Sequence, residues 1–226
     1  MNLSITLGKS FCDNKDIVFD LAKDNIHTVV FSGMTGSGKS AFHHRVIQQL
    51  MRQNSPEEVG FVLIDFKKVE FGEYQGSPYL LQPVLFELEE AAACLRGLVR
   101  ESSRRFHGKI TPQKTLVVHI EECDIVYLAP GLLEELWKTV NEQASKNNMH
   151  LFFSSSRTEP EVFSRELLQH SDLRGWFVPG GEWYRAYDKT MNAYASRILD
   201  RPPSCIPAPW TRIFQPRDGV EVQCKG

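Results

Sequence analysis

The chain alternates short runs of β-branched and aromatic residues with longer stretches of helical periodicity, and this alternation restricts its fold more than any other feature. The short runs are almost continuously apolar, which is typical of strands that are covered on both faces. Strands joined by connections that each contain a helix run parallel, with right-handed crossovers. We therefore expect an α/β fold with a mainly parallel central sheet and helices on both faces. Strands are expected at 27–32, 59–66, 115–120, 150–154 and 174–178, and helices at 39–53, 88–106, 131–147 and 161–169.

Length, charge and cysteine content narrow the classes of function. A chain of 226 residues predicts one domain, or one domain with a small appendage. Lys and Arg number 26 against 28 Asp and Glu, so no global basic field draws the protein onto nucleic acid or anionic lipid. The five cysteines form no C-x-x-C pair, which disfavours a zinc ribbon and a disulfide framework. No run approaches the roughly 18 apolar residues of a membrane span, and we expect a cytoplasmic protein without membrane insertion.

Residues 33–40 read G-M-T-G-S-G-K-S and match the phosphate-binding pattern G-x-x-x-x-G-K-[ST] in full. The motif follows an expected strand and opens an expected helix, so backbone N–H groups and the helix N-terminus can surround a phosphate. Lys39 is predicted to reach the β- and γ-phosphates as a catalytic residue, and the Ser40 hydroxyl to ligate Mg²⁺. The alternative, a glycine-rich turn with a chance lysine, is disfavoured by the complete pattern. The predicted nucleotide-binding residues are Gly33, Met34, Thr35, Gly36, Ser37, Gly38, Lys39, Ser40 and Ala41.

Two carboxylates follow the apolar run at 115–120. Nucleotide hydrolysis requires an acid near the metal and a group that activates the attacking water, and both stand at strand ends. We assign the metal-side role to Glu121 and the general-base role to Glu122, and expect their strand to lie beside the phosphate-binding strand. In the alternative, both residues cap the strand and face solvent. Asp65, which also ends a strand, is a rival for the metal role.

Beyond these residues, the chain resembles the motor domain of FtsK/SpoIIIE-type DNA translocases, within the HerA/FtsK group of RecA-like ATPases. The similarity extends over about residues 7–177. The matching segments are L-G-K at 7–9, D-L-A-K at 20–23, L-I-D-F-K-K-V-E at 63–70, S-P-Y-L-L at 77–81, the acidic strand, and M-H-L-F-F-S-S-S-R at 149–157, which resembles the family's I-H-L-I-L-A-T-Q-R.

The resemblance implies a RecA-like P-loop fold that uses ATP and Mg²⁺ to move double-stranded DNA through a homo-oligomeric, hexameric ring, with a membrane-associated protein as a further partner. The motor core is expected at 1–182. After Trp183, one helical stretch and two short β-like runs at 211–214 and 220–223 predict a C-terminal helix and a hairpin or sheet extension at 183–226, packed on the same domain. Two alternatives stay open. One is a degenerate P-loop module that binds ATP as a scaffold for assembly, and the other is a secretion-type ATPase that moves protein.

Several positions depart from the family pattern and predict slow hydrolysis. Glu121 stands where the family has Asp, and Ser156 stands where it has a glutamine expected to sense the γ-phosphate. Ser145 replaces the arginine that is expected to reach a neighbouring subunit, which leaves only Lys146 nearby. A lysine reproduces the planar, bidentate contact of an arginine poorly. Arg157 and Arg174 are the other candidates for a contact across an interface, although a structural ion pair is favoured for both.

For three further groups of residues we favour a structural role, in packing or at the solvated surface, over ligand binding. His43 and His44 are expected to pack on the helix after the phosphate loop, and His119 is expected in the core. A basic set could follow a DNA backbone, but it also fits the solvated face of a helix. An aromatic cluster could stack on bases, but packing is favoured. The basic set is Arg96, Arg100, Arg104, Arg105, Lys109 and Lys114, and the aromatic cluster is Trp176, Trp183, Tyr184 and Tyr187.

Overall fold

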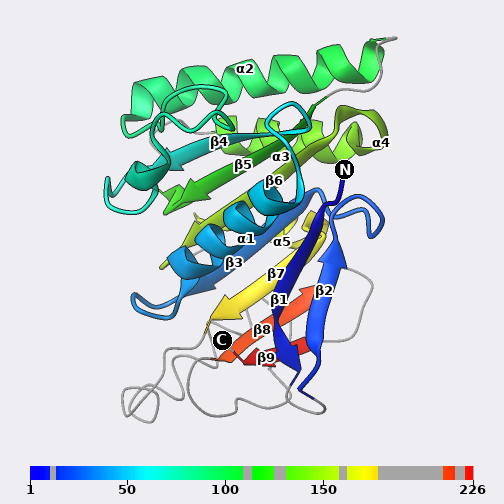
Figure 1. Ribbon diagram of the computed structural model, residues 1–226. Coiled ribbons are helices and arrows are strands. Elements are labelled where there is room, and N and C mark those ends of the chain that lie inside the picture. Colours follow the sequence, from blue (N-terminus) through cyan, green and yellow to red (C-terminus); the bar gives the residue numbers. More distant parts are fainter. Residues whose placement is uncertain are drawn as a thin grey trace.

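A computed structural model describes residues 1–10, 14–108, 114–124, 131–157, 162–177, 211–216 and 222–225. Its strands form one nine-stranded sheet in the order β2-β1-β9-β8-β7-β3-β6-β5-β4 (Figure 1). The five neighbouring strands β7, β3, β6, β5 and β4 pair in parallel. The α/β prediction is therefore confirmed. These strands are β3 (Thr28–Gly33), β4 (Val59–Asp65), β5 (Thr115–Glu121), β6 (Met149–Ser155) and β7 (Leu173–Phe177).

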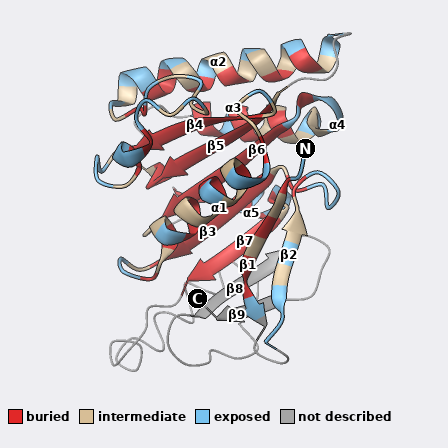
Figure 2. Cartoon of the chain, in the orientation of Figure 1, coloured by how far each residue is buried: buried red, intermediate tan, exposed pale blue. Residues whose placement is uncertain are grey.

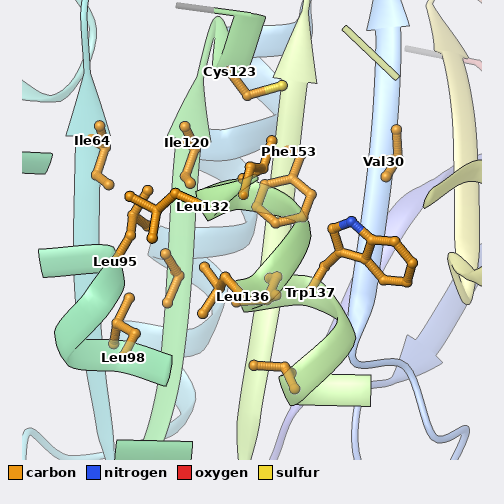
Figure 3. Packing of buried hydrophobic residues seen from close by; sticks show 14 of the residues in the cluster. Val30, Ile64, Leu95, Leu98, Ile120, Cys123, Leu132, Leu136, Trp137 and Phe153 are labelled. Atoms are coloured by element: carbon orange, nitrogen blue, oxygen red, sulfur yellow. The ribbon is translucent and has the colours of Figure 1, made fainter. Parts of the chain in front are cut away.

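Helices cover both faces of the parallel strands, as expected. One hydrophobic cluster joins the sheet to α1, and a second joins the other face to α2, α3 and α5. All five parallel strands are buried along their length (Figure 2), which explains their almost continuous apolar sequences. Figure 3 shows the second cluster, where Leu95 and Trp137 approach the sheet residues Ile120 and Phe153. The helices are α1 (Lys39–Gln53), α2 (Leu88–His107), α3 (Leu132–Glu142), α4 (Ala144–Asn147) and α5 (Arg165–His170), with a 3₁₀ turn η1 (Phe71–Tyr74) after β4.

Two helices differ from the sequence prediction. The helix expected at 131–147 divides at Gln143, whose φ of −106° and ψ of 11° leave the helical region. The buried Asn147 side chain donates to the carbonyl of Val140 at 2.8 Å, a competing local bond of the kind that ends helices. Helix α5 begins only at Arg165, because the Ser164 side chain accepts the backbone N–H of Leu167 and caps it. Residues 158–161, where the helix was expected to start, lie outside the described ranges.

An N-terminal hairpin extends the sheet and was not predicted. Strands β1 (Ser4–Ser10) and β2 (Asp16–Asp20) pair antiparallel. Leu3, Ile5 and Leu7 are buried in the cluster that contains α1, and polar residues alternate with them. This period of two is the signal that marks a strand with one buried face.

The expected C-terminal hairpin is present as β8 (Thr211–Pro216) and β9 (Val222–Lys225). Strand β8 pairs with β7, and β9 pairs with β1, so the hairpin joins the two parts of the sheet. The domain division at 182/183 and the helix expected after Trp183 lie outside the described ranges, as do Tyr184 and Tyr187. Trp176 is 1% exposed, in agreement with a packing role. None of the helices in the described part of the chain combines the length and apolar character needed to cross a membrane.

Candidate nucleotide-binding and catalytic site

The candidate site lies at the carboxyl edge of the parallel strands, where β3 ends at Gly33 and β5 ends at Glu121. The expectation that these two strands are direct neighbours is wrong, because β6 pairs with both and lies between them. Its sequence, M-H-L-F-F-S-S, suits this central position, since all seven residues are buried. The serines at its end therefore fill the space between the phosphate loop and the acids, which the sequence did not predict.

The phosphate loop has the close backbone packing that its glycines permit. A Cβ atom on Gly33 would lie 2.3 Å from the carbonyl oxygen of Phe177, so no larger residue fits there. Gly38 has a φ of 92° and directly precedes α1, a conformation that glycine adopts without strain. Within the loop, Ser37 is buried and Met34 is half-buried, whereas Thr35, Gly36 and the following Ala41 are exposed. The loop thus joins a buried strand to the N-terminus of a 15-residue helix, the geometry that favours phosphate.

The ammonium group of Lys39 lies inside this loop. Its Nζ atom donates to the carbonyl oxygens of Gly33 at 2.7 Å and Met34 at 3.3 Å, and the residue is 5% exposed. Burial lowers the pKa of Lys39, while the carboxylates of Glu122 and Glu121 act in the opposite direction. The charge of the lysine is therefore held close to both acids.

Glu121 lies beside the first turn of α1. The Ser40 hydroxyl donates to its Oε1 atom at 3.1 Å, and the Ser154 hydroxyl donates to Oε2 at 2.5 Å. His43 Nε2 is 3.0 Å from the same Oε2. Burial alone raises the pKa of Glu121, but hydrogen bonds from His43 and Ser154 and the charge of Lys39 outweigh it and lower the pKa to about 2. An ionised carboxylate oxygen and a serine hydroxyl so close together are hard ligands of the kind that Mg²⁺ prefers.

Glu122 has different partners, and its backbone adopts a left-handed conformation with a φ of 51°. Its carboxylate forms an ion pair with Lys67, which follows β4. Oε2 also accepts the backbone N–H of Ser156 at 2.8 Å and its hydroxyl at 2.9 Å. Burial raises the pKa of Glu122, whereas the hydrogen bonds from Lys67 and Ser156 lower it, with a net decrease. Glu122, the acid assigned as general base, is thus ionised, but its carboxylate is already bonded to Lys67 and Ser156.

Asp65, the rival for the metal role, stabilises a loop. Its two oxygens accept four backbone N–H groups at 2.8 to 3.1 Å, from Lys67, Lys68, Glu70 and Phe71. The residue is fully buried. A carboxylate that already accepts four hydrogen bonds has little remaining capacity for a metal, so the geometry favours Glu121.

The residues predicted to sense a γ-phosphate or to cross a subunit interface occupy different places. Ser156 lies beside Glu122, and Arg157 forms a 3.8 Å ion pair with Asp124. Arg174 is the second residue of β7 and is 6% exposed, and this burial within its own chain disfavours a role across an interface. Lys146 is exposed near the amino end of β6, with its Nζ atom 5.4 Å from the ring centroid of Phe106.

The basic set on and after α2 is only partly exposed: Arg96, Arg100 and Arg104 are exposed, as expected for a solvated helix face, whereas Lys114 is half-buried. Arg105 is 6% exposed and donates to the backbone carbonyls of Lys114 and Asn147 at 2.8 and 2.9 Å. Arg104 and Arg105 both pair with Glu101, which neutralises part of their charge. The idea that Arg105 contacts a DNA backbone is therefore wrong, and Lys109 lies outside the described ranges.

Sequence reasoning missed the side chains that hold the two acids. His43 and His119 are both fully buried, as a packing role requires, but their Nδ1 atoms are also 2.7 Å apart and the pair leads to Glu121. His43 lies one helical turn after Lys39, and His119 precedes Glu121 by two residues on the same strand. These spacings place both imidazoles on the same side as their functional neighbours, and they are the signal that could have revealed the contact. No comparable local pattern indicates the ion pair of Glu122 with Lys67.

Comparison with known proteins gives related sequences and similar structures. The FtsK/SpoIIIE family model matches residues 1–121. The DNA translocase FtsK of Caldanaerobacter subterraneus subsp. tengcongensis is 32% identical over 179 residues, which cover 72% of this chain and 25% of the relative. The DNA translocase FtsK of Mycobacterium tuberculosis is 30% identical over 182 residues, which cover 66% of this chain and 22% of the relative. The chain thus spans about a quarter of the length of the curated relatives it matches.

Solved structures show the same fold at lower sequence identity. The cytoplasmic domain of the Thermomonospora curvata type VII secretion ATPase EccC has a TM-score of 0.73 and 20% identity, covering 99% of this chain and 28% of that one. The pCW3 conjugation coupling protein TcpA, in a monomer form with ATPγS, has a TM-score of 0.75 and 19% identity, and the match covers 100% of this chain and 66% of that one. Together with the match to more than half of the sequence, these findings confirm the RecA-like P-loop fold. The chain belongs to the FtsK/SpoIIIE family.

Proposed function

We propose that this chain binds ATP with Mg²⁺ and hydrolyses it, and that hydrolysis drives double-stranded DNA through a hexameric ring of identical subunits. The observation that carries the proposal is the contact between Ser40 of the phosphate loop and Glu121, with Glu122 next in sequence. It brings a phosphate cradle, a metal-side acid and a candidate base to one edge of the sheet. Membership of a family whose curated relatives are named DNA translocases supports DNA as the substrate.

The residues near Ser40 fit a magnesium ion. The Ser40 hydroxyl would bind it directly, and the Glu121 carboxylate would hold a water molecule bound to it, so that both residues offer oxygen atoms to the site. When bound, Mg²⁺ neutralises phosphate charge and favours attack at the γ-phosphate. Lys39 would exchange its bonds to the loop carbonyls for bonds to phosphate oxygens, and would thereby bring a cation to the site of developing negative charge.

Glu122 would accept a proton from the attacking water. Its lowered pKa keeps the carboxylate ionised at neutral pH, but the ion pair with Lys67 and the bonds from Ser156 occupy it. Hydrolysis therefore requires these partners to move or to share the carboxylate with water. The Lys67 side chain is 40% exposed, so a neighbouring subunit or a DNA phosphate could compete for it. This arrangement agrees with the slow basal hydrolysis expected from the sequence.

The ring supplies the remaining contacts in this proposal. Lys146 and Arg157 are exposed and are the candidates to approach a neighbour's nucleotide. DNA would be held through its phosphates, which requires no sequence reading and gives salt-dependent binding. A membrane-associated partner protein would complete the assembly in the cell, as the family resemblance implies.

A second candidate is a nucleotide-dependent assembly module that turns over little ATP. The engagement of Glu122 by Lys67 and Ser156 favours it, as do the serines at 145 and 156. In this case nucleotide binding would change how subunits pack without repeated cycles.

The decisive experiment measures ATP hydrolysis with and without duplex DNA, at two salt concentrations, for the native chain, Lys39→Ala and Glu122→Gln. We expect DNA to stimulate hydrolysis, more strongly at low salt, and Lys39→Ala to lose nucleotide binding and turnover. A Lys39→Ala protein as active as the native chain would overturn the enzymatic proposal. Normal ATP affinity with slow turnover that ignores DNA would favour the assembly module. Stimulation by a protein substrate in place of DNA would favour a secretion-type ATPase.

A further inference from the structure

A row of buried polar side chains lies behind Glu121, in a region where packing alone would require apolar residues. It consists of His119 on β5, His43 on α1 and Ser154 on β6, and each is fully buried. Phe31, Phe71 and Phe152 surround the two imidazoles with ring centroids 4.7 to 6.4 Å away. Burying polar groups costs free energy unless they are hydrogen-bonded, so such a row in an aromatic environment needs an explanation.

The row divides the two oxygens of Glu121 between different partners. Ser154 Oγ lies 2.5 Å and His43 Nε2 lies 3.0 Å from Oε2, while Ser40 Oγ lies 3.1 Å from Oε1. His43 Nε2 is also 2.9 Å from Ser154 Oγ, so the three groups form a closed triangle. Oε2 is therefore held toward the interior, and Oε1 faces the first turn of α1.

His119 determines which nitrogen of His43 carries the proton. His119 is fully buried and stacked on Phe152, and a charged ring there would carry an Nε2–H donor without a partner among the described residues, so we take this ring as neutral, with one N–H group. Its Nδ1 atom is 2.7 Å from His43 Nδ1, and its Nε2 atom has no hydrogen-bond partner among the described residues. A proton on Nδ1 is thus bonded, whereas a proton on Nε2 would be a buried, unpaired donor, which is rare in proteins.

The rest of the proton arrangement follows. If His119 donates from Nδ1, His43 accepts at its own Nδ1 and carries its proton on Nε2, where it donates to Glu121. The reverse arrangement would direct the Nε2 lone pair of His43 at a carboxylate, or would require a buried imidazolium. In metal sites, a hydrogen bond to one nitrogen commonly sets the tautomer at the other in this way.

We propose that His43, held in one tautomer by His119, is a positioning residue that acts with Ser154 to fix Glu121 so that Oε1 faces the metal side of Ser40. The inference rests on the proposed function, because it assigns a role toward Mg²⁺. A glutamate has one more rotatable bond than the aspartate of the family pattern, and ordering it costs more entropy. Ser154 stands where that pattern has alanine, so two departures from the pattern contact each other here. The buried triangle compensates for the longer side chain.

Long-range ¹H–¹⁵N correlation spectra of the imidazole rings in the native chain test the proton arrangement without any ligand. We expect neutral rings at both positions, with the proton on Nε2 of His43 and on Nδ1 of His119. His119→Leu should leave His43 as a mixture of tautomers. Any other protonation pattern on His43 in the native chain overturns the proposed relay.

Metal affinity tests the positioning role. Mn²⁺ is titrated into protein carrying bound ATPγS, and free Mn²⁺ is followed by electron paramagnetic resonance. We expect Ser154→Ala and the double variant His43→Leu/His119→Leu to bind Mn²⁺ roughly 10-fold more weakly, at the low end of the effect of losing an outer-shell partner in a metal site. ATPγS affinity measured in EDTA should not change. Should the double variant fail to fold, Ser154→Ala, which removes a single hydroxyl, still decides the question.

Two comparisons separate positioning from general destabilisation. His150→Leu is the matched control, because His150 is equally buried on the same strand as Ser154 but bonds to the Ile26 carbonyl at the other end, at 2.6 Å. It should lose stability without losing Mn²⁺ affinity. In a Glu121→Gln background, Ser154→Ala should change Mn²⁺ affinity less than about twofold, because positioning acts only through the carboxylate. Unchanged affinity in the Ser154 and histidine variants, or the same 10-fold loss without Glu121, overturns the inference. Native protein that neither binds ATPγS nor hydrolyses ATP would instead contradict the proposed function itself.

Discussion

Two consecutive carboxylates at the end of β5 lie in contrasting surroundings. Glu121 points into the molecule and is held by a histidine and two serines from α1 and β6. Glu122 points toward the loop after β4 and is held by the partly exposed Lys67 and by Ser156. His43 and Ser154 in the first set are fully buried, whereas the Lys67 side chain in the second is 40% exposed and can move into solvent. The difference supports the proposal that Glu121 is held in place to bind a metal and that Glu122 can be released to act as a base.

The largest effect is expected from Glu122→Gln, which removes the proposed base but keeps the shape and the bonds from Ser156. General bases contribute about 10²- to 10⁴-fold, so we expect hydrolysis to fall by at least 100-fold while ATP affinity stays within a few-fold. Steady-state turnover and equilibrium binding of a fluorescent ATP analogue measure the two quantities. If Glu122→Gln lost ATP binding and turnover equally, Glu122 would not differ from Glu121 in acting on chemistry alone.

The second largest effect is expected in acid unfolding, which should depend on the ionisation of Glu121. Because the folded-state pKa of Glu121 is about 2, below the usual value of 4.5, its ionisation stabilises the fold above pH 4.5. This contribution, on the order of 3 kcal/mol, is lost as the pH falls from 4.5 toward 2. Urea unfolding at pH 6, 4 and 3 should show a smaller loss in Glu121→Gln than in the native chain. Identical pH dependence of the two proteins would contradict the assignment.

A matched pair of serines on β6 sharpens the comparison. Ser154→Ala removes a fully buried donor to Glu121, and we expect it to lower the free energy of unfolding by about 1.5 to 3 kcal/mol, as for hydrogen bonds to charged groups. Ser156→Ala should cost less than about 1 kcal/mol, because water can replace the hydroxyl of this half-buried residue and its backbone N–H still binds Glu122. Equal costs, measured by urea denaturation at pH 7, would show that the two acids are held equally firmly.

The smallest effect on stability is expected from Lys67→Met. Partly exposed ion pairs contribute about 1 kcal/mol or less. Loss of the cation should nevertheless raise the pKa of Glu122, since Lys67 helps to lower it. The acidic limb of the pH profile of hydrolysis should therefore move to higher pH, and added salt should produce a similar shift in the native chain. Lys138→Met, which breaks a remote ion pair with Glu134, is the control and should leave the profile unchanged.

The elements that carry a local pattern were predictable from the sequence. Helix α1 begins and ends where its periodicity predicts, at Lys39 and Gln53, and the five parallel strands agree within two residues. The phosphate loop and the two acids could be proposed as a site from the sequence because strand, turn and helix signals follow one another in a short stretch. The alternation at Leu3, Ile5 and Leu7 was overlooked, although the same reasoning would have identified β1.

What could not be predicted depends on which strands become neighbours. The position of β6 between β3 and β5 follows from packing over the whole chain, and neither its own sequence nor theirs determines it. The contacts of Ser154 with Glu121 and of Lys67 with Glu122 depend on that order. The break at Gln143 likewise results from a buried amide on Asn147, whose tertiary environment overrides helix propensity.

The meeting of β9 with β1 has a consequence for folding. Lys225 pairs with Lys9, and Cys224 pairs with Ser10, so the sheet is completed only when segments from the two ends of the described chain associate. Contacts this distant in sequence form slowly, because the chain must lose the entropy of closing a long loop before the contacts stabilise the fold. The parallel core can assemble first from neighbouring strand–helix units. The N-terminal hairpin then pairs with β9 at a later stage of folding.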